Sequence, residues 1–365
     1  MNSSCNPKTD DRYPMTDRDL KAFSVVGRRS SVVGFLTAAV VLGLLLTTGV
    51  GSSTSVPIKF ATLAPEGSTW MQALRAMDEE LRTQSGGRVH LTFYPGGVAG
   101  DEIDVLRKIR IGQLHGGAFS GVGLGAVLPA VRVLELPLLF RDAGEVDYVT
   151  AAMEEKFARA FEEQGFVLLA FAEAGFVHIF SKRAIRHRED LNRVKVWTWQ
   201  GDPLALAMFR AYEEAPVPLA LPEVFPSLQT GLIDAFYAPP LAAIALQWFS
   251  QVSYMSSEGF TNAIGGMLIA RSRWEAIPAA LQGMVKTVVK KYARQVVVRT
   301  RQENQEALKV LNRQGIQMVD LHPEERNRLL QVSREVWEGQ AGKLYPRALL
   351  EEVQSLLKAY RERKP

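Results

Sequence analysis

The spacing of hydrophobic residues from position 58 predicts a short strand followed by a helix. Ile58–Leu63 is mainly apolar and typical of a buried strand. Ser68 is a suitable helix N-cap, and Gly86-Gly87 is a suitable helix end. The apolar positions between them recur every three or four residues and so share one helix face: Met71, Leu74, Met77 and Leu81.

The next segment repeats this order. Arg88–Tyr94 alternates between polar and apolar residues, as a half-buried strand does, and Pro95-Gly96-Gly97 follows as a turn. A second helix is expected from Asp101 to Gly112. Strand, helix, strand, helix predicts an α/β fold with a parallel sheet and helices on both of its faces.

Further elements are expected along the rest of the chain, without an internal repeat. The predicted strands are Phe166–Phe171, Phe176–Ser181 and Val194–Thr198. The predicted helical segments are Pro203–Tyr212, Pro222–Thr230, Pro278–Gln314 (closed by Gly315) and a final region, Pro323–Arg363.

The N-terminal region has the order of an export signal. No charged residue lies between Arg29 and Lys59, and Val32–Val50 is an almost unbroken apolar run. Arg28-Arg29 precedes it and small residues follow it, so cleavage is expected near residues 51–55. The alternative is a retained anchor, because an apolar run of about 19 residues can just span a bilayer. Both readings place the body in the periplasm.

Charge and cysteine content exclude several functions. Residues 1–29 hold six Lys or Arg and four Asp out of totals of 43 and 39, which leaves 37 basic and 35 acidic side chains in the body. Because basic and acidic side chains are nearly equal in number after residue 29, no nucleic-acid partner is predicted. The single cysteine, Cys5, precedes the apolar run, which excludes disulfides and a cysteine nucleophile from the exported part.

No set of residues predicts catalysis, a metal or a cofactor. The five histidines lack the spacing of metal ligands. Gly121–Ala126 fits the pattern G-x-G-x-x-A, but Pro129 would interrupt the helix that a dinucleotide needs, so we expect these glycines to let the backbone approach a ligand. Ser120 has no assignable His and acid partners, and we therefore predict that the protein is not an enzyme.

Five segments, in the same order, resemble the solute receptors of TRAP (tripartite ATP-independent periplasmic) transporters, the DctP-like proteins. The resemblance covers about residues 57–340. Its most specific pieces are Gly86–Val89 through Tyr94–Gly97, Leu106 through Gly112-Gln113-Leu114, Leu136-Pro137-Leu138-Leu139-Phe140, Leu228-Gln229-Thr230-Gly231-Leu232-Ile233-Asp234, and Trp274-Glu275-x-Ile277-Pro278.

The resemblance implies a periplasmic-binding-protein-like fold, with two α/β domains joined by hinge strands and a long helix and the ligand cleft between them. Residues 1–55 would be the leader. Domain I would comprise 56–177 and about 267–305, and domain II 178–266 and about 306–365 with the C-terminal helices. The implied partners are a small-molecule ligand and the small and large permease subunits of a TRAP transporter.

The departures from the family pattern fall at ligand positions. In Asp190–Trp199 the family's carboxylate-clamping arginine is replaced by Trp197, and a second basic position aligns near Val177. The usual Gly-Gln-Glu-Asn-Pro becomes Ala235-Phe236-Tyr237-Ala238-Pro239, and a polar contact on the first strand becomes Leu63 or Ala64. Each change alone could be core packing. Together they resemble a subfamily with an apolar pocket and a periplasmic TPR-repeat partner.

We therefore expect an extracytoplasmic receptor for an apolar or amphipathic ligand. Glu173 could bond to the ligand or pair locally. The alternatives are an organic-acid receptor with a relocated carboxylate clamp, and a sensor or enzyme on the same frame. The expected ligand-binding residues are Trp197, Trp199, Phe236, Tyr237, Phe119, Ser120, Trp70, Glu173 and Val177.

Overall fold

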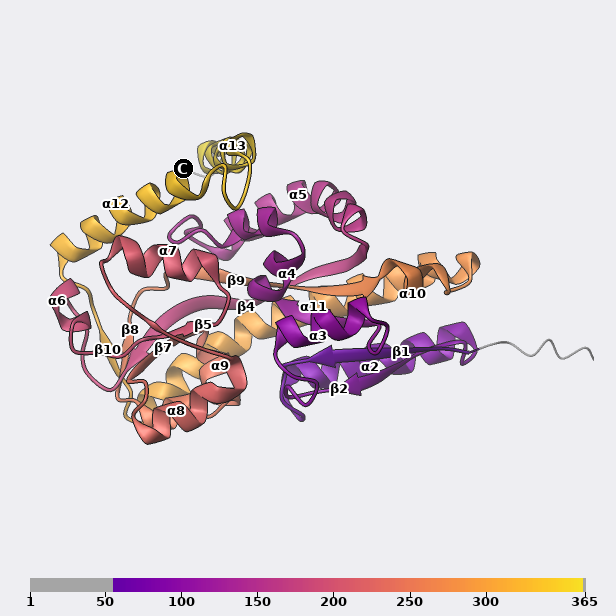
Figure 1. Ribbon diagram of the computed structural model, residues 1–365, viewed down its shortest axis with the longest axis horizontal. Coiled ribbons are helices and arrows are strands. Elements are labelled where there is room, and N and C mark those ends of the chain that lie inside the picture. Colours follow the sequence, from indigo (N-terminus) through magenta and orange to yellow (C-terminus); the bar gives the residue numbers. More distant parts are fainter. Residues whose placement is uncertain (1–54, 364–365) are drawn as a thin grey trace, which may run out of the picture. The chain divides into compact units, whose positions relative to one another are not determined.

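The computed structural model describes residues 55–363, so the leader predicted for residues 1–55 lies outside the described residues except for Ser55. Figure 1 shows the arrangement of the elements. The strands are β1 (Val56–Thr62), β2 (Val89–Tyr94), β3 (Gly116–Ser120), β4 (Phe166–Ser181), β5 (Trp197–Trp199), β6 (Val217–Leu219), β7 (Ala235–Ala238), β8 (Tyr254–Ser256), β9 (Thr261–Ala270) and β10 (Gln317–Val319).

The α-helices are α2 (Thr69–Ser85), α3 (Glu102–Arg110), α4 (Gly121–Val127), α5 (Ala143–Glu163), α6 (Arg188–Leu191), α7 (Pro203–Ala211), α8 (Val224–Thr230), α9 (Pro240–Ala245), α10 (Arg271–Glu275), α11 (Ala279–Arg313), α12 (Pro323–Gln340) and α13 (Arg347–Arg363). Three 3₁₀ helices complete the described part: η1 (Pro129–Glu135), η2 (Leu221–Glu223) and η3 (Trp248–Gln251). No helix among these residues is long and apolar enough to cross a membrane.

The main sheet is mixed. Its strand order is β10-β8-β4-β9-β3-β1-β2, and β7 also pairs with β4. β1 is parallel to both β2 and β3, as the strand–helix repeat predicts. β9 lies antiparallel between β3 and β4, which joins the early strands to the rest of the sheet. β5 and β6 form a separate parallel pair.

Helix α2 follows the sequence prediction closely. The Ser68 side chain accepts a hydrogen bond from the Met71 N–H at 3.3 Å, and Gly86 ends the helix with φ of 61°. A positive φ costs glycine little because it has no Cβ. The predicted apolar face is buried against β1, β2 and α11.

The two strands predicted at Phe166–Phe171 and Phe176–Ser181 are one continuous strand, β4. The break in apolar residues at Glu173 and Gly175 marks a register irregularity, not a turn. Gly175 has φ of 108°, which lets the strand change direction without ending. The prediction of two separate strands is wrong because pairing with β9 continues through the irregular segment.

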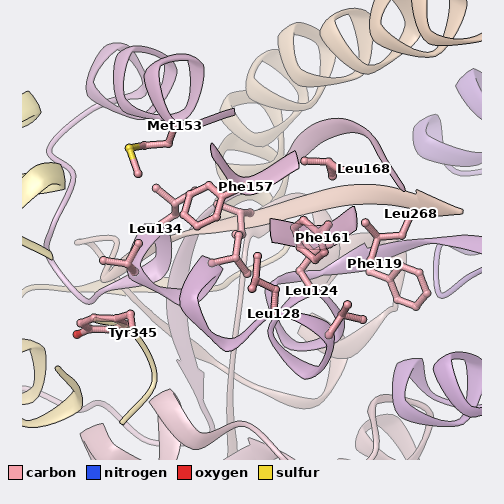
Figure 2. Close-up of a cluster of buried hydrophobic side chains, with 14 of the residues drawn as sticks. Phe119, Leu124, Leu128, Leu134, Met153, Phe157, Phe161, Leu168, Leu268 and Tyr345 are labelled. Carbon is pink, nitrogen blue, oxygen red and sulfur yellow. The ribbon is translucent and has the colours of Figure 1, made fainter. Parts of the chain in front are cut away.

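Alternation along β4 and β9 builds a core on each face of the sheet. Phe166 and Leu168 pack with α5 in one cluster, whereas Val167 and Leu169 pack with α2 and α11 in another. Successive side chains of a strand point to opposite faces, so these strands must be covered on both sides. Figure 2 shows part of the cluster on the α5 side, in which Phe157, Phe161 and Leu268 are labelled.

The final helical region consists of two helices, separated after Gln340. α12 packs against α7, and α13 packs against α5. Figure 1 shows α12 and α13 in yellow near α7 and α5. Leu350 and Val353 of α13 belong to the same core cluster as α5 and η1.

Candidate ligand-binding site

A cavity of about 430 Å³ lies among β3, β4, β5, β7, β9, η1, α4, α7 and α12. This volume is in the range of sites that enclose a small organic molecule. Most of its lining is aliphatic or aromatic.

The structure brings together the predicted ligand-binding residues, with one exception. The cavity is lined by Trp70, Phe119, Ser120, Glu173, Val177, Trp197, Trp199 and Tyr237. Leu63 and Ala64, the departures predicted on the first strand, also line it.

Phe236 is outside this lining. It is buried in the core, where its ring stacks on Phe180 with centroids 4.9 Å apart and meets Trp248 edge-on at 5.1 Å. Tyr237, the next residue of β7, lines the cavity. Because adjacent strand residues point to opposite faces, Phe236 and Tyr237 could not both face it.

Trp197 fills the place where the resemblance puts an arginine. Only 1% of its surface is exposed, and its indole N–H donates to the Leu219 carbonyl at 3.0 Å. Its ring stacks on Tyr237 at 4.9 Å and meets Trp248 edge-on at 5.5 Å. Trp197 is therefore packed into an aromatic cluster at the cavity wall, and its single polar hydrogen is already used.

Trp199 bonds across the cavity wall to the segment before α3. Its indole N–H donates to Asp101 Oδ2 at 2.9 Å, and the Leu221 N–H reaches the same oxygen at 3.2 Å. Asp101 also caps α3, since its other oxygen accepts the Glu102 N–H at 2.7 Å. The Asp101 carboxylate thus joins three segments that are distant in sequence.

Three other predicted side chains use their polar groups within the protein. The Ser120 hydroxyl donates to Glu102 Oε2 at 2.7 Å and accepts from the Val122 N–H at 3.2 Å. The Trp70 indole donates to Thr300 Oγ1 at 3.1 Å. Glu173 forms an ion pair with Arg301 of α11, so its charge is paired within the protein, and it also accepts a hydrogen bond from Asn262.

Sequence reasoning missed four buried charged residues of the lining: Arg132, Glu135 and Asp202, which form a cluster of ion pairs, and Glu102, which lies with Ser120 and Gly123. Arg132 Nη2 lies 3.0 Å from Asp202 Oδ1, and its Nε lies 2.8 Å from Glu135 Oε2. Glu135 also accepts the Ile264 N–H at 3.0 Å. The sequence holds one signal of this pair: Arg132 and Glu135, three residues apart, interrupt an otherwise apolar segment.

The glycines of α4 make room for these charged residues. A Cβ on Gly121 would collide with the Glu135 carboxylate, one on Gly123 with Glu102, and one on Gly125 with the Arg132 side chain. Gly121 also lines the cavity, so the expectation that these glycines bring the backbone close to a ligand stays a prediction. What the structure shows is that they accommodate charged side chains of the same chain.

Burial perturbs two of these carboxyl groups. It raises the pKa of Glu102 to about 7, against the opposing effect of N–H donors from Ser120 and Gly123. It raises the pKa of Glu135 to about 7 as well, although Arg132 acts to lower it. Near neutral pH both carboxyl groups therefore populate their neutral and ionised forms.

Another buried acid lies where α12 borders the cavity. Glu325 is 9% exposed, and its Oε1 has no hydrogen-bond partner among the described residues. The Tyr212 hydroxyl is close to it: burial, followed by the charge of Glu325, raises the pKa of this tyrosine. This end of the cavity therefore holds an acid whose Oε1 is itself buried and whose carboxyl group interacts with the Tyr212 hydroxyl.

A family model for the DctP proteins, described as bacterial extracellular solute-binding protein, family 7, matches residues 60–343. The chain belongs to this family. Members are solute receptors of TRAP transporters, not enzymes, and the predicted family and α/β fold are confirmed. Among the described residues of this DctP protein, no group of His, Cys, Asp and Glu could hold a metal ion.

Individual relatives are distant. A solute-binding protein from Verminephrobacter eiseniae is 26% identical over 252 residues, which cover 68% of this chain and 74% of the relative. The 2,3-diketo-L-gulonate-binding periplasmic protein YiaO of Escherichia coli is 20% identical over 273 residues, 73% of this chain and 83% of that protein.

The solved structures show the fold. The sugar acid binding protein DctPAm from Advenella mimigardefordensis, in complex with galactonate, superposes with a TM-score of 0.79 at 19% identity. The match covers 84% of this chain and 99% of that one. The frame of the DctP family is therefore retained along nearly all of the described chain.

Proposed function

We propose that this TRAP solute receptor captures an apolar or amphipathic small molecule and delivers it to a TRAP membrane transporter. The observation that carries the proposal is Trp197, which occupies the arginine position and has its indole N–H bonded to Leu219. A guanidinium at this position would offer a fork of donors to a ligand carboxylate, whereas an indole offers one N–H and an apolar face.

The polar side chains of the lining support this proposal. Those of Ser120, Glu102, Glu173 and Asp202 are bonded to other groups of the protein. A small dicarboxylate or sugar acid would lose its hydration in the cavity with little to replace it. Apolar ligand surface is instead stabilised by about 25 cal/mol per Å² buried.

The direct test is native mass spectrometry of the protein purified from the periplasmic fraction, with a co-purified apolar or amphipathic molecule as the expected result. Binding of the neutral fluorescent probe N-phenyl-1-naphthylamine then measures the apolar site, and succinate or sialic acid serves as competitor. Tight binding of either acid that persists in Trp197→Ala would contradict the proposal, since the acid would be held elsewhere.

One observation favours a second candidate, an organic-acid receptor with a relocated clamp. Arg132 is a buried cation that lines the cavity, and the Advenella protein binds galactonate. Against it, two carboxylates already share this guanidinium. Galactonate binding that is lost in Arg132→Met would favour this candidate.

We also propose that two domains close around the ligand, with domain I at 56–177 and about 267–305, and domain II at 178–266 and from about 306. The contacts of Trp199 with Asp101 and of Asp202 with Arg132 join the two parts across the cavity. Because α13 packs with α5, we assign α13 to domain I, which changes the division expected from the sequence.

The expected partners are the small and large permease subunits, with a periplasmic TPR-repeat protein as the further partner of a receptor with an apolar pocket. To test this, the receptor is produced with an unrelated cleavable export signal in place of its own. It is then affinity-purified in the presence of the proteins encoded by the neighbouring genes. Recovery of the permease subunits without a TPR protein would remove only that partner.

A further inference from the structure

The cavity lining contains more acidic than basic side chains. The charged residues of the lining are Glu102, Glu135, Glu173, Asp202, Glu325, Arg132 and Arg188. Two of them have partners outside the lining: Glu173 pairs with Arg301, and Arg188 pairs with Glu213. Among the described lining residues this leaves four carboxyl groups and one arginine, Arg132, which contacts two of them, Glu135 and Asp202.

Arg132 can neutralise only one of its two neighbours. Its guanidinium contacts Asp202 through Nη2 and Glu135 through Nε. Glu102 faces Asp101, Ser120 and Gly123, and its only donors are uncharged. Around Arg132 the wall therefore carries more carboxyl groups than cations, and a buried carboxylate without a counter-charge is costly.

Glu325 is a second, independent observation, because it comes from α12 and lies beside Tyr212 instead of Arg132. It forms no ion pair among the described residues, and its buried Oε1 lacks a donor. Two arginines, Arg188 and Arg328, lower the pKa of Tyr212 from nearby, but neither is ion-paired with Glu325. Glu325 thus adds a carboxyl group to the lining without adding a paired cation.

We infer that the ligand is an amphipathic organic cation, an apolar molecule bearing an amine or ammonium group, whose positive charge balances the carboxyl groups of the cavity wall. This inference rests on the proposed function and names the ligand class of the same cavity. The aromatic walls suit such a molecule, because Trp and Tyr rings attract a cation at their faces and also bury its apolar part.

Tyr237 connects the aromatic part of the cavity wall with the charged residues around Arg132. Its ring lies against Trp197 and lines the cavity, and both Asp202 and Arg132 act on its hydroxyl. A ligand resting on Tyr237 would therefore have its charged group beside the carboxyl groups around Arg132.

The test compares three probes with the same alkyl chain, 1-octylamine, 1-octanol and octanoate, by isothermal titration calorimetry at pH 7. We expect the amine to bind at least tenfold more tightly than the alcohol, and the carboxylate to bind most weakly. Octanoate binding as tightly as the amine would overturn the inference.

Variants test which carboxyl groups cause the preference for the amine. Glu135→Gln and Glu325→Gln should each reduce the preference for amine over alcohol several-fold, because the affinity for octylamine falls more than that for octanol. Glu275→Gln, which removes a carboxylate from an exposed ion pair with Arg271, is the control and should leave all three affinities unchanged. Thermal unfolding confirms that each variant is folded, and a preference unchanged in both cavity variants would contradict the assignment.

Proton exchange gives a second readout. A bound cation favours the ionised form of the carboxyl groups of Glu102 and Glu135, so octylamine binding near pH 7 should release protons. Calorimetric titration in buffers of different ionisation enthalpy measures this release. Proton uptake would overturn the inference.

The failures are distinguishable. If octanol binds as tightly as octylamine, the receptor still takes an apolar ligand but the inference of a cationic ligand is refuted. Binding of succinate or galactonate with none of the octyl probes would refute both proposals.

Discussion

At the scale of single residues, Trp197 occupies the position where the resemblance places a carboxylate-clamping arginine, and the receptor frame is retained around it. The ring is enclosed by Tyr237, Trp199 and Trp248, and the indole N–H is bonded to the protein. Its position in the sequence indicates the loss of a carboxylate clamp. Only the structure shows that its single donor is also occupied.

Trp197→Ala should destabilise the protein strongly. Truncation of a fully buried tryptophan removes its apolar contacts and leaves a cavity, at a typical cost of about 3–5 kcal/mol. Urea unfolding followed by circular dichroism measures the change. A loss below about 1 kcal/mol would mean that the aromatic cluster repacks and that Trp197 is not central to it.

Glu102 predicts a dependence of stability on pH. Its pKa is about 7 in the folded protein against an ordinary value of 4.5, so between these pH values the folded state keeps a proton that the unfolded chain has released. The contribution is full below pH 4.5 and is lost as pH rises through 7, at about 1.4 kcal/mol per unit.

Urea unfolding between pH 5 and 7.5 tests this with Glu102→Gln. The variant should be less stable overall, because a glutamine places an amide where Ser120 and Gly123 donate. Its stability should nevertheless fall less steeply with pH than that of the wild type. Parallel slopes would show that Glu102 does not titrate in this range.

At the scale of elements, α4 depends on residues that are far from it in sequence. Gly121 lies against Glu135 and Gly123 against Glu102, so these glycines are required by tertiary neighbours and not by a turn. Helix α2, in contrast, is specified locally by its cap, its apolar face and its terminal glycine. This is why α2 was predicted closely and the environment of the α4 glycines was not.

Two glycine-to-alanine variants separate these causes. Gly121→Ala should destabilise by about 1–3 kcal/mol, because the added methyl group overpacks a site occupied by the Glu135 carboxylate. Gly283→Ala, at an exposed position of α11 with no neighbour within 4 Å, should stabilise by about 0.5–1 kcal/mol. Thermal unfolding measures both, and equal effects would contradict the steric account.

At the scale of the whole molecule, the proposed closure depends on contacts between distant segments. Ligand binding should compact the protein in small-angle scattering. Trp199→Phe removes the hydrogen bond to Asp101 and should favour the open form, giving a larger radius of gyration without ligand. Trp274→Phe, in the core beside α2, is the matched control and should leave the radius unchanged. An unchanged radius in Trp199→Phe would argue against this contact as a closure element.

The sequence by itself determined the family, the strand–helix repeat and eight of the nine expected ligand-binding residues, which the structure places in the cavity lining. These depend on local signals: caps, turn glycines, alternation, and motifs that keep their order along the chain. Tertiary structure decided that β4 is one strand, that Phe236 faces the core, and that Arg132, Glu135 and Asp202 meet beside the cavity. Burial and charge pairing depend on which distant segments lie side by side, and no local pattern in one sequence specifies those contacts.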